Sequence, residues 1–191
     1  MTLKLIAAPS TAPVTVSEAK THLRVDVSDD DTYIDTLIAV ATRIAEDRTG
    51  RALMTQTWDL LLDAFPAAEI MVGKLPIQSI THVKYYDPDS ALQTIDSADY
   101  VLDPDVLPGW VLPAYGLAWP ATLDSANVVM VRFVAGYADA ASVPAPIRQW
   151  ILLSVGQLYQ QREPVVVGAS VAALPRDYCD ALLDPYRLHF L

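Results

Sequence analysis

Four aspartates within six residues, Asp26, Asp29, Asp30 and Asp31, form the densest group of side chains that could do chemistry. Their carboxylates are the kind of ligand that Ca²⁺ prefers. A calcium loop, however, alternates its ligands, has a glycine at its centre and ends on a bidentate glutamate. Here three aspartates are consecutive, no glycine lies among them, and helical periodicity follows at once. The cluster therefore predicts the start of a helix, where the helix dipole favours negative charge, rather than a metal site.

The other reactive side chains do not form a catalytic or metal-binding pattern. His22, His82 and His189 lie in separate segments, and none has a second histidine at metal-ligand spacing. No serine lies in the glycine pattern of a nucleophile elbow, and the seven glycines do not cluster into a phosphate-binding loop. The single cysteine, Cys179, excludes an internal disulfide and is expected to be a small buried hydrophobe. The sequence predicts no catalytic residue, no metal site and no cofactor.

Composition and charge narrow the kinds of partner. The chain has 191 residues, which is enough for one good core with a protruding lobe. It is 52% hydrophobic and only 19% charged, which favours a protein that buries surface in an oligomer or complex. Its 13 basic and 23 acidic residues give a net charge of −10. Such a surface is not expected to bind DNA, since DNA binding requires Lys and Arg side chains that neutralise the phosphates. The negative charge could also serve only to keep the protein soluble.

We expect no membrane anchor and no secretion signal. The apolar run at the N-terminus ends at Pro9, which is too short for a signal peptide. No stretch approaches the 18 apolar residues that a membrane-spanning helix needs. These features are typical of a cytoplasmic protein.

The aspartate cluster lies between two predicted helices. Ser17 is expected to cap a helix over residues 18–24, and Ser28 is expected to cap a second helix with three aspartates in its first turn. Gly50 is expected to end this second helix in a left-handed conformation. Its apolar residues recur at three- and four-residue spacing and are expected to form one core face: Ile34, Leu37, Ile38, Ala41, Ile44 and Ala45.

After Gly50 the periodicity becomes that of β-strands. Strands are predicted at 55–62, 70–72, 77–86, 92–95, 100–102 and 127–134, the last as the central strand. Four prolines in 103–120 predict irregular edge strands there. The aromatic residues of this region could line a binding surface, but in a β layer they are expected to pack into the core: Trp58, Tyr85, Tyr86, Trp110, Tyr115 and Trp119.

Helical signals return at the C-terminal end. A helix is predicted from Pro144 or Pro146 to about Arg162, and a short one over 175–183. Between them, 165–173 is an apolar loop that either folds back onto the core or is covered by a partner. The predicted fold class is α+β, with a single domain over 1–191. Its helical core comes from 16–50 and 143–187, and a mainly antiparallel β insertion occupies about 53–137.

Three segments, in this order along the chain, resemble one family, the head–tail connector proteins of tailed bacteriophages. These proteins are also called adaptor or DNA-packaging proteins, and they are common in prophages and gene transfer agents. The first is SEAKTHLRVD with YIDTLIAVATRIAEDRTGRALMTQTW, within 17–58. The second is VRFVAGY at 131–137 followed by VPAPIRQWILLSVGQLYQQRE at 143–163. The third is LPRDYCDALLDPYR at 174–187, and the Trp119-Pro120 pair is a weaker match. The resemblance is strong at both helical ends and weak in the β insertion.

The resemblance implies a structural virion protein. Such proteins form a ring, commonly of twelve subunits, under the portal protein, extend the DNA channel and carry a stopper or tail protein. DNA would pass without specific binding, and the protein would lie in the virion and, during assembly, in the host cytoplasm. The residues expected at a subunit or portal interface are Val165, Val166, Val167, Pro185, Tyr186 and Arg187. Two alternatives are another head-completion or tail-terminator role, and a β-rich ligand-binding or enzymatic module.

Overall fold

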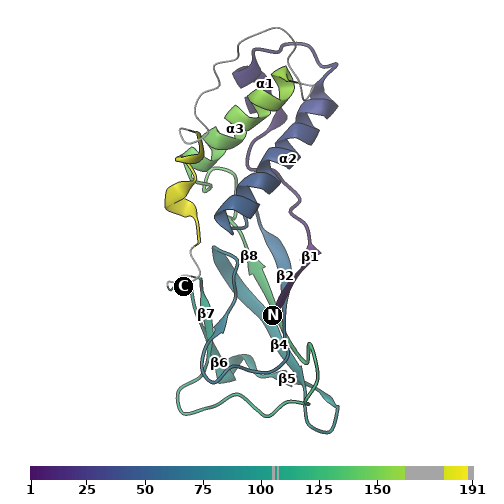
Figure 1. Cartoon of the computed structure of the whole chain (residues 1–191), viewed down its shortest axis with the longest axis vertical. Coiled ribbons are helices and arrows are strands. Elements are labelled where there is room, and N and C mark those ends of the chain that lie inside the picture. Colours follow the sequence, from purple (N-terminus) through teal and green to yellow (C-terminus); the bar gives the residue numbers. More distant parts are fainter. Residues whose placement is uncertain (105, 107, 162–178, 189–191) are drawn as a thin grey trace. The chain divides into compact units, whose positions relative to one another are not determined.

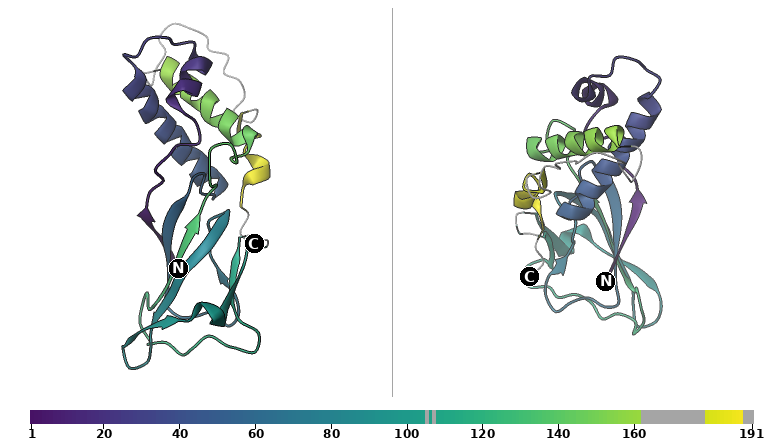
Figure 2. Two further views of the ribbon diagram at one scale, coloured as in Figure 1. Left: turned by 180° about the vertical axis from the view of Figure 1, so that it is seen from behind. Right: turned by 45° about the horizontal axis from the view of Figure 1, so that its top comes forward.

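The computed structural model describes the chain except for residues 105, 107, 162–178 and 189–191 (Figure 1). It has the predicted α+β class. The chain divides into two compact units. Within the described residues, the helical unit comprises 11–54 and 138–188, and the β unit comprises Met1–Ser10 and Thr55–Tyr137. Figure 2 shows the same two units from other directions.

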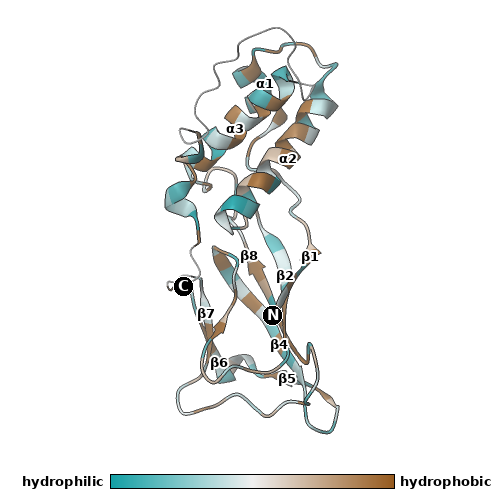
Figure 3. Cartoon of the chain, viewed as in Figure 1, coloured by the Kyte–Doolittle hydropathy of each residue, from teal (hydrophilic) through white to brown (hydrophobic). Residues whose placement is uncertain are grey.

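Three α-helices pack against one another in the helical unit: α1 (Val16–Leu23), α2 (Asp31–Thr49) and α3 (Ala145–Gln160). Five of the six residues predicted for the core face of α2 are buried, but Ile44 is 37% exposed and that part of the prediction is wrong. The buried face of α3 repeats at three- and four-residue intervals and consists of Ile147, Trp150, Ile151 and Val155. Figure 3 shows these apolar stripes along the helices.

The helix ends differ in part from the prediction. Gly50 ends α2 in the left-handed conformation as expected, with φ +74°. The cap of α1 is Thr15 and not Ser17, because Thr15 together with Glu18 completes a reciprocal capping box. Ser28 and Asp29 precede α2, whose N-cap is Asp30 without a side-chain cap bond. Only Asp31 of the aspartate cluster therefore lies in the first turn of α2.

The capping box makes the stability of the helical unit depend on pH. The Thr15 backbone N–H donates to the Glu18 carboxylate at 2.8 Å, and Arg148 pairs with the same carboxylate. The Thr15 backbone bond is the largest cause that lowers the pKa of Glu18 below 4.5; the Thr15 hydroxyl and Arg148 add to it. The stabilisation is therefore complete above pH 4.5 and is lost as the pH falls through the lowered pKa.

We expect Glu18→Gln to lower the thermal unfolding midpoint at pH 7 and to have progressively less effect as the pH falls below about 4.5. The glutamine keeps the shape of the side chain but not the charge that these donors stabilise. Thermal unfolding followed by circular dichroism at pH 7 and pH 3 would measure the difference. Asp29→Asn, at an exposed position, serves as the control. A Glu18→Gln deficit of equal size at both pH values would contradict the account.

The β unit contains a five-stranded antiparallel sheet in the order β1-β2-β8-β4-β5. Its strands are β1 (Thr2–Ala7), β2 (Gln56–Leu62), β8 (Val129–Ala135), β4 (Ile77–Tyr86) and β5 (Leu92–Ile95). The strand β8 is central, as predicted. The strand β1 was not predicted, although polar and apolar residues alternate at its start, with Lys4 between two leucines. It pairs with β2 and forms one edge of the sheet.

A second sheet has three strands in the order β3-β7-β6. They are β3 (Ile70–Met71), β7 (Trp110–Pro113) and β6 (Tyr100–Asp103), and a single 3-10 turn, η1 (Ser97–Asp99), leads into β6. The proline-rich segment thus supplies the central strand of this sheet, which corrects the prediction of edge strands. This is compatible with proline chemistry because Pro108 precedes β7 and Pro113 is its last residue.

One face of the five-stranded sheet carries the core of the β unit. Trp58 and Phe133 are cross-strand neighbours, as are Leu60 and Val131, and all four are at most 6% exposed. Val111, from the smaller sheet, is fully buried. Because side chains alternate along a strand, the residues between these lie on the opposite face of the sheet, which we call the outer face.

Within the described residues, no helix is long and apolar enough to cross a membrane.

Candidate functional site

Three of the six residues predicted at an interface are described, and all three lie at the C-terminal end of the helical unit. Pro185 and Tyr186 belong to the 3-10 turn η2 (Asp184–Tyr186), and Arg187 follows it. Pro185 and Arg187 are exposed and Tyr186 is half-buried. Val165, Val166 and Val167 lie outside the described residues.

This segment is held to the helical unit by backbone contacts. Arg51 Nε donates to the carbonyl of Tyr186 at 2.7 Å, and the backbone N–H of Leu188 donates to the Thr49 carbonyl at 2.9 Å. Leu183 is fully buried. The segment therefore presents Pro185 and Arg187 from a fixed backbone.

A polar cluster fixes the start of the same segment. The Asp180 carboxylate pairs with Arg48 of α2 and accepts a hydrogen bond of 3.2 Å from the indole N–H of Trp150 in α3. The Arg48 guanidinium lies 5.2 Å from the centre of the Trp150 ring, within the range of a cation–π contact. One aspartate thus links both long helices to the C-terminal segment.

We expect Asp180→Asn to lower the free energy of unfolding by about 1 kcal/mol, because it removes the charge that Arg48 pairs with while keeping an acceptor for Trp150. It should also speed proteolysis within residues 179–188, because Asp180 holds that segment to α2 and α3. Urea denaturation and limited proteolysis would measure these effects. Asp184→Asn is the matched control, since within the described part of the chain Asp184 pairs with Arg187 three residues later and both are exposed. Equal effects of the two substitutions would argue against the cluster.

The aspartate cluster does not assemble into a metal site. Asp31 pairs with Lys20 at 2.6 Å, Asp30 accepts a 2.5 Å hydrogen bond from Tyr159, and Asp26 and Asp29 are exposed. No group of three potential metal ligands occurs among the described residues. Two of the four aspartates thus take part in an ion pair or a hydrogen bond beside the start of α2.

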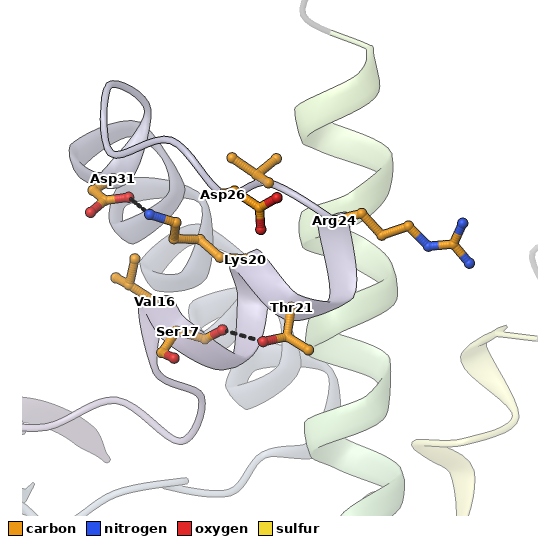
Figure 4. Close-up of a pocket in the computed structure, with 8 residues that line it drawn as sticks. Val16, Ser17, Lys20, Thr21, Arg24, Asp26 and Asp31 are labelled. Atoms are coloured by element: carbon orange, nitrogen blue, oxygen red, sulfur yellow. Dashed lines mark hydrogen bonds and ion pairs between the residues drawn. The ribbon is translucent and has the colours of Figure 1, made fainter.

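An open hollow of about 700 Å³ lies beside α1. It is lined by Val16, Ser17, Lys20, Thr21, Arg24, Val25, Asp26 and Asp31. Figure 4 shows that Arg24 points away from the other labelled side chains, while Lys20 is joined to Asp31. The charged groups of the hollow therefore do not converge on one point, as a small-molecule site would require.

The remaining candidate residues are separated. His22 is exposed in α1, whereas His82 is half-buried on β4; His189 lies outside the described residues. Burial, followed by the nearby Lys84 and Arg132, lowers the pKa of His82. Cys179 is half-exposed, so the prediction of a buried cysteine is wrong.

The aromatic residues of the β unit mostly pack as predicted. Trp58 is 6% exposed, and the ring of Phe65 stacks on Trp119 at 4.9 Å. Tyr86 and Tyr115 are the exceptions. Tyr86, the last residue of β4, is 41% exposed, and Tyr115, in the turn before Gly116, is fully exposed, so the core prediction is wrong at both positions.

A row of charged side chains crosses the outer face and was not predicted. Lys4 of β1 is opposite Asp59 of β2, which is opposite Arg132 of β8, which is opposite His82 of β4. Arg132 binds Asp59 through two hydrogen bonds of 2.7 and 2.8 Å, and the Asp59 side chain is only 5% exposed. This pairing raises the pKa of Arg132 further above its ordinary value. The signal in the sequence was the alternation of these residues with apolar ones along each strand.

The fold is shared with proteins of a phage-like particle. One match is a chain from "Neck of empty GTA particle computed with C6 symmetry", with a TM-score of 0.82 and 22% identity. Others come from "Virion of native gene transfer agent (GTA) particle", at 0.83 and 23%, and from "Neck of native GTA particle computed with C12 symmetry", at 0.74 and 23%. Each match covers 100% of this chain and 97% of the other. The class that these matches define is therefore one of fold, which this chain shares over its whole length with those chains.

A family model matches part of the sequence. Residues 13–93 match the model of the family described as "Phage gp6-like head-tail connector protein". The match covers less than half of the chain and supports the resemblance to head–tail connector proteins. The matched segment contains α1, α2 and the strands β2, β3 and β4. No curated protein matches.

Proposed function

We propose that the chain is a head–tail connector subunit that forms a ring under the portal, extends the DNA channel and joins the capsid to the tail. The observation that carries the proposal is the family match over 13–93 on a chain whose whole length shares its fold with neck subunits. The C6 and C12 symmetry of those necks supports a ring, commonly of twelve subunits. The role is structural and not catalytic, and the protein works in the virion after assembly in the bacterial host cytoplasm.

The surface of the chain suits this role. A net charge of −10 disfavours binding to phosphates, so DNA would pass through the ring without being held. The exposed Pro185 and Arg187 provide contacts for the portal or a neighbouring subunit from a fixed backbone. A stopper or tail protein would bind the other side of the ring.

The test is the mass of the purified chain by light scattering, alone and after mixing with the portal protein of the same particle. We expect a complex with a fixed ratio of chain to portal, and a weaker complex when Arg187 is replaced by Glu. Arg43→Glu, at an exposed position in α2, is the control. Absence of binding under all conditions would refute the proposal. Addition of the chain to purified heads before and after the stopper would distinguish a tail-terminator role.

A further inference from the structure

The five-stranded sheet has two free edges within the part of the chain that the structure describes. Its order places β1 at one edge and β5 at the other. An edge strand carries unpaired backbone N–H and C=O groups and can pair with another chain. Leu5 and Ile6 of β1 are each 39% exposed and Leu92 of β5 is 55% exposed, so both edges also offer apolar side chains. A ring needs two different surfaces of this kind on every subunit.

The two edges run in the same direction. Each strand is antiparallel to its neighbour in the sheet, and five is an odd number, so β1 and β5 are parallel to each other. Copies related by the small rotation of a many-membered ring keep nearly the same strand direction. The edge β1 of one copy would therefore pair with β5 of the next as parallel strands, not antiparallel ones.

The charges of the two edges are complementary. The row on the outer face begins with Lys4, then Asp59, Arg132 and His82. Val83 is opposite Ile95, so one further step in the same register places Asp96 beside His82. Lys4 is exposed without an ion-pair partner among the described residues, and Asp96 is exposed at the other end of the row. If Lys4 of a second copy lies beside Asp96 of the first copy, the alternation of positive and negative side chains continues from one sheet into the next.

A lysine on an edge strand commonly discourages pairing, and a β-bulge does the same. The register of β1 shifts only between Leu5 and Ala7, which leaves Thr2–Leu5 regular. Lys4 also meets an opposite charge on the edge that it would face. These two observations indicate that the β1 edge pairs with one specific partner strand. They argue against an edge whose lysine and bulge prevent pairing with any strand.

We propose that neighbouring copies in the ring join through their sheets, with β1 of one copy parallel to β5 of the next and Lys4 beside Asp96. This inference rests on the proposed ring. The neighbouring row on the outer face has Thr2 at the β1 edge and Thr94 at the β5 edge; its members are Thr2, Leu61, Met130, Lys84 and Thr94. If the strands run along the ring axis, pairing Lys4 with Asp96 therefore also places Thr2 of one copy opposite Thr94 of the next. Both threonines are exposed.

Paired single cysteines test the register. Thr2→Cys and Thr94→Cys are made separately in a Cys179→Ser background, mixed, bound to heads that carry their portal, and oxidised. Opposed residues of neighbouring strands lie about 4.8 Å apart, within disulfide range. We expect a covalent dimer from the mixture and none from either variant alone. Adding Lys4→Glu to the Thr2→Cys variant should lower the dimer yield several-fold.

Each other outcome has a distinct meaning. Rings that form on the portal without a disulfide in the mixture would overturn the sheet pairing and leave the connector role intact. A dimer from Thr2→Cys alone would show that two β1 edges meet, which also overturns the proposal. Failure of the parent Cys179→Ser protein to bind the portal at all would instead refute the connector role on which the inference rests.

Discussion

Phe133→Ala should lower the free energy of unfolding of the β unit by about 3–5 kcal/mol. Phe133 is fully buried in the central strand β8, opposite Trp58 on one side and Ile80 on the other. Removing the ring loses its burial and leaves a cavity that three neighbouring strands cannot close without breaking their register. Its truncation should be among the most costly, because Phe133 is the largest fully buried side chain among the described residues.

Urea denaturation followed by tryptophan fluorescence would measure this loss, since Trp58 reports on the site directly. The matched control is Val134→Ala, the next residue of the same strand, whose side chain lies on the outer face and is only half-buried. We expect the control to cost less than about 1.5 kcal/mol. Similar losses for the two variants would mean that the core does not lie on the face assigned to it.

Arg132→Met should lower the free energy of unfolding by about 2–4 kcal/mol. The Asp59 side chain is 5% exposed, and Arg132 supplies both of its charge-assisted hydrogen bonds of 2.7 and 2.8 Å. The substitution leaves a buried carboxylate without its counter-charge. The loss falls toward the lower end of that range because Arg132 itself is 32% exposed and water can partly replace it.

The double variant Asp59→Leu with Arg132→Met separates this explanation from a simple loss of packing. Because no buried charge is left, it should be close to the wild type in stability and clearly more stable than Arg132→Met alone. Lys84→Met, on the same face one row away, is the control for removing a cation. Urea midpoints for the wild type and the three variants make the comparison. A double variant less stable than Arg132→Met would contradict the account.

Local patterns in the sequence predicted most elements of the fold. The strands β4 and β5 have the predicted bounds, and α3 begins beside Pro144 as expected. The cap of α1 was assigned to Ser17 although Thr15 and Glu18 have capping-box spacing. Ile44 continues the helical periodicity of α2, but it lies outside the arc that the other helices cover.

Long-range pairing was harder to predict. Nothing local shows that β1 joins β2 across more than fifty residues, or that the outer-face charges of four strands fall into one row. Register depends on which strands become neighbours, and strand alternation alone fixes only the face. The prediction of edge strands in the proline-rich segment was wrong because it did not consider which strands become neighbours. A proline before β7 and another as its last residue do not prevent a short central strand.

The most direct test of the proposed connector role is electron cryomicroscopy of the neck of particles assembled in the presence of this chain. The account predicts a closed ring of this fold beneath the portal, with the helical and β units both recognisable and the DNA channel passing through it. A neck in which another protein occupies that position, or in which this chain is absent, would contradict the assignment.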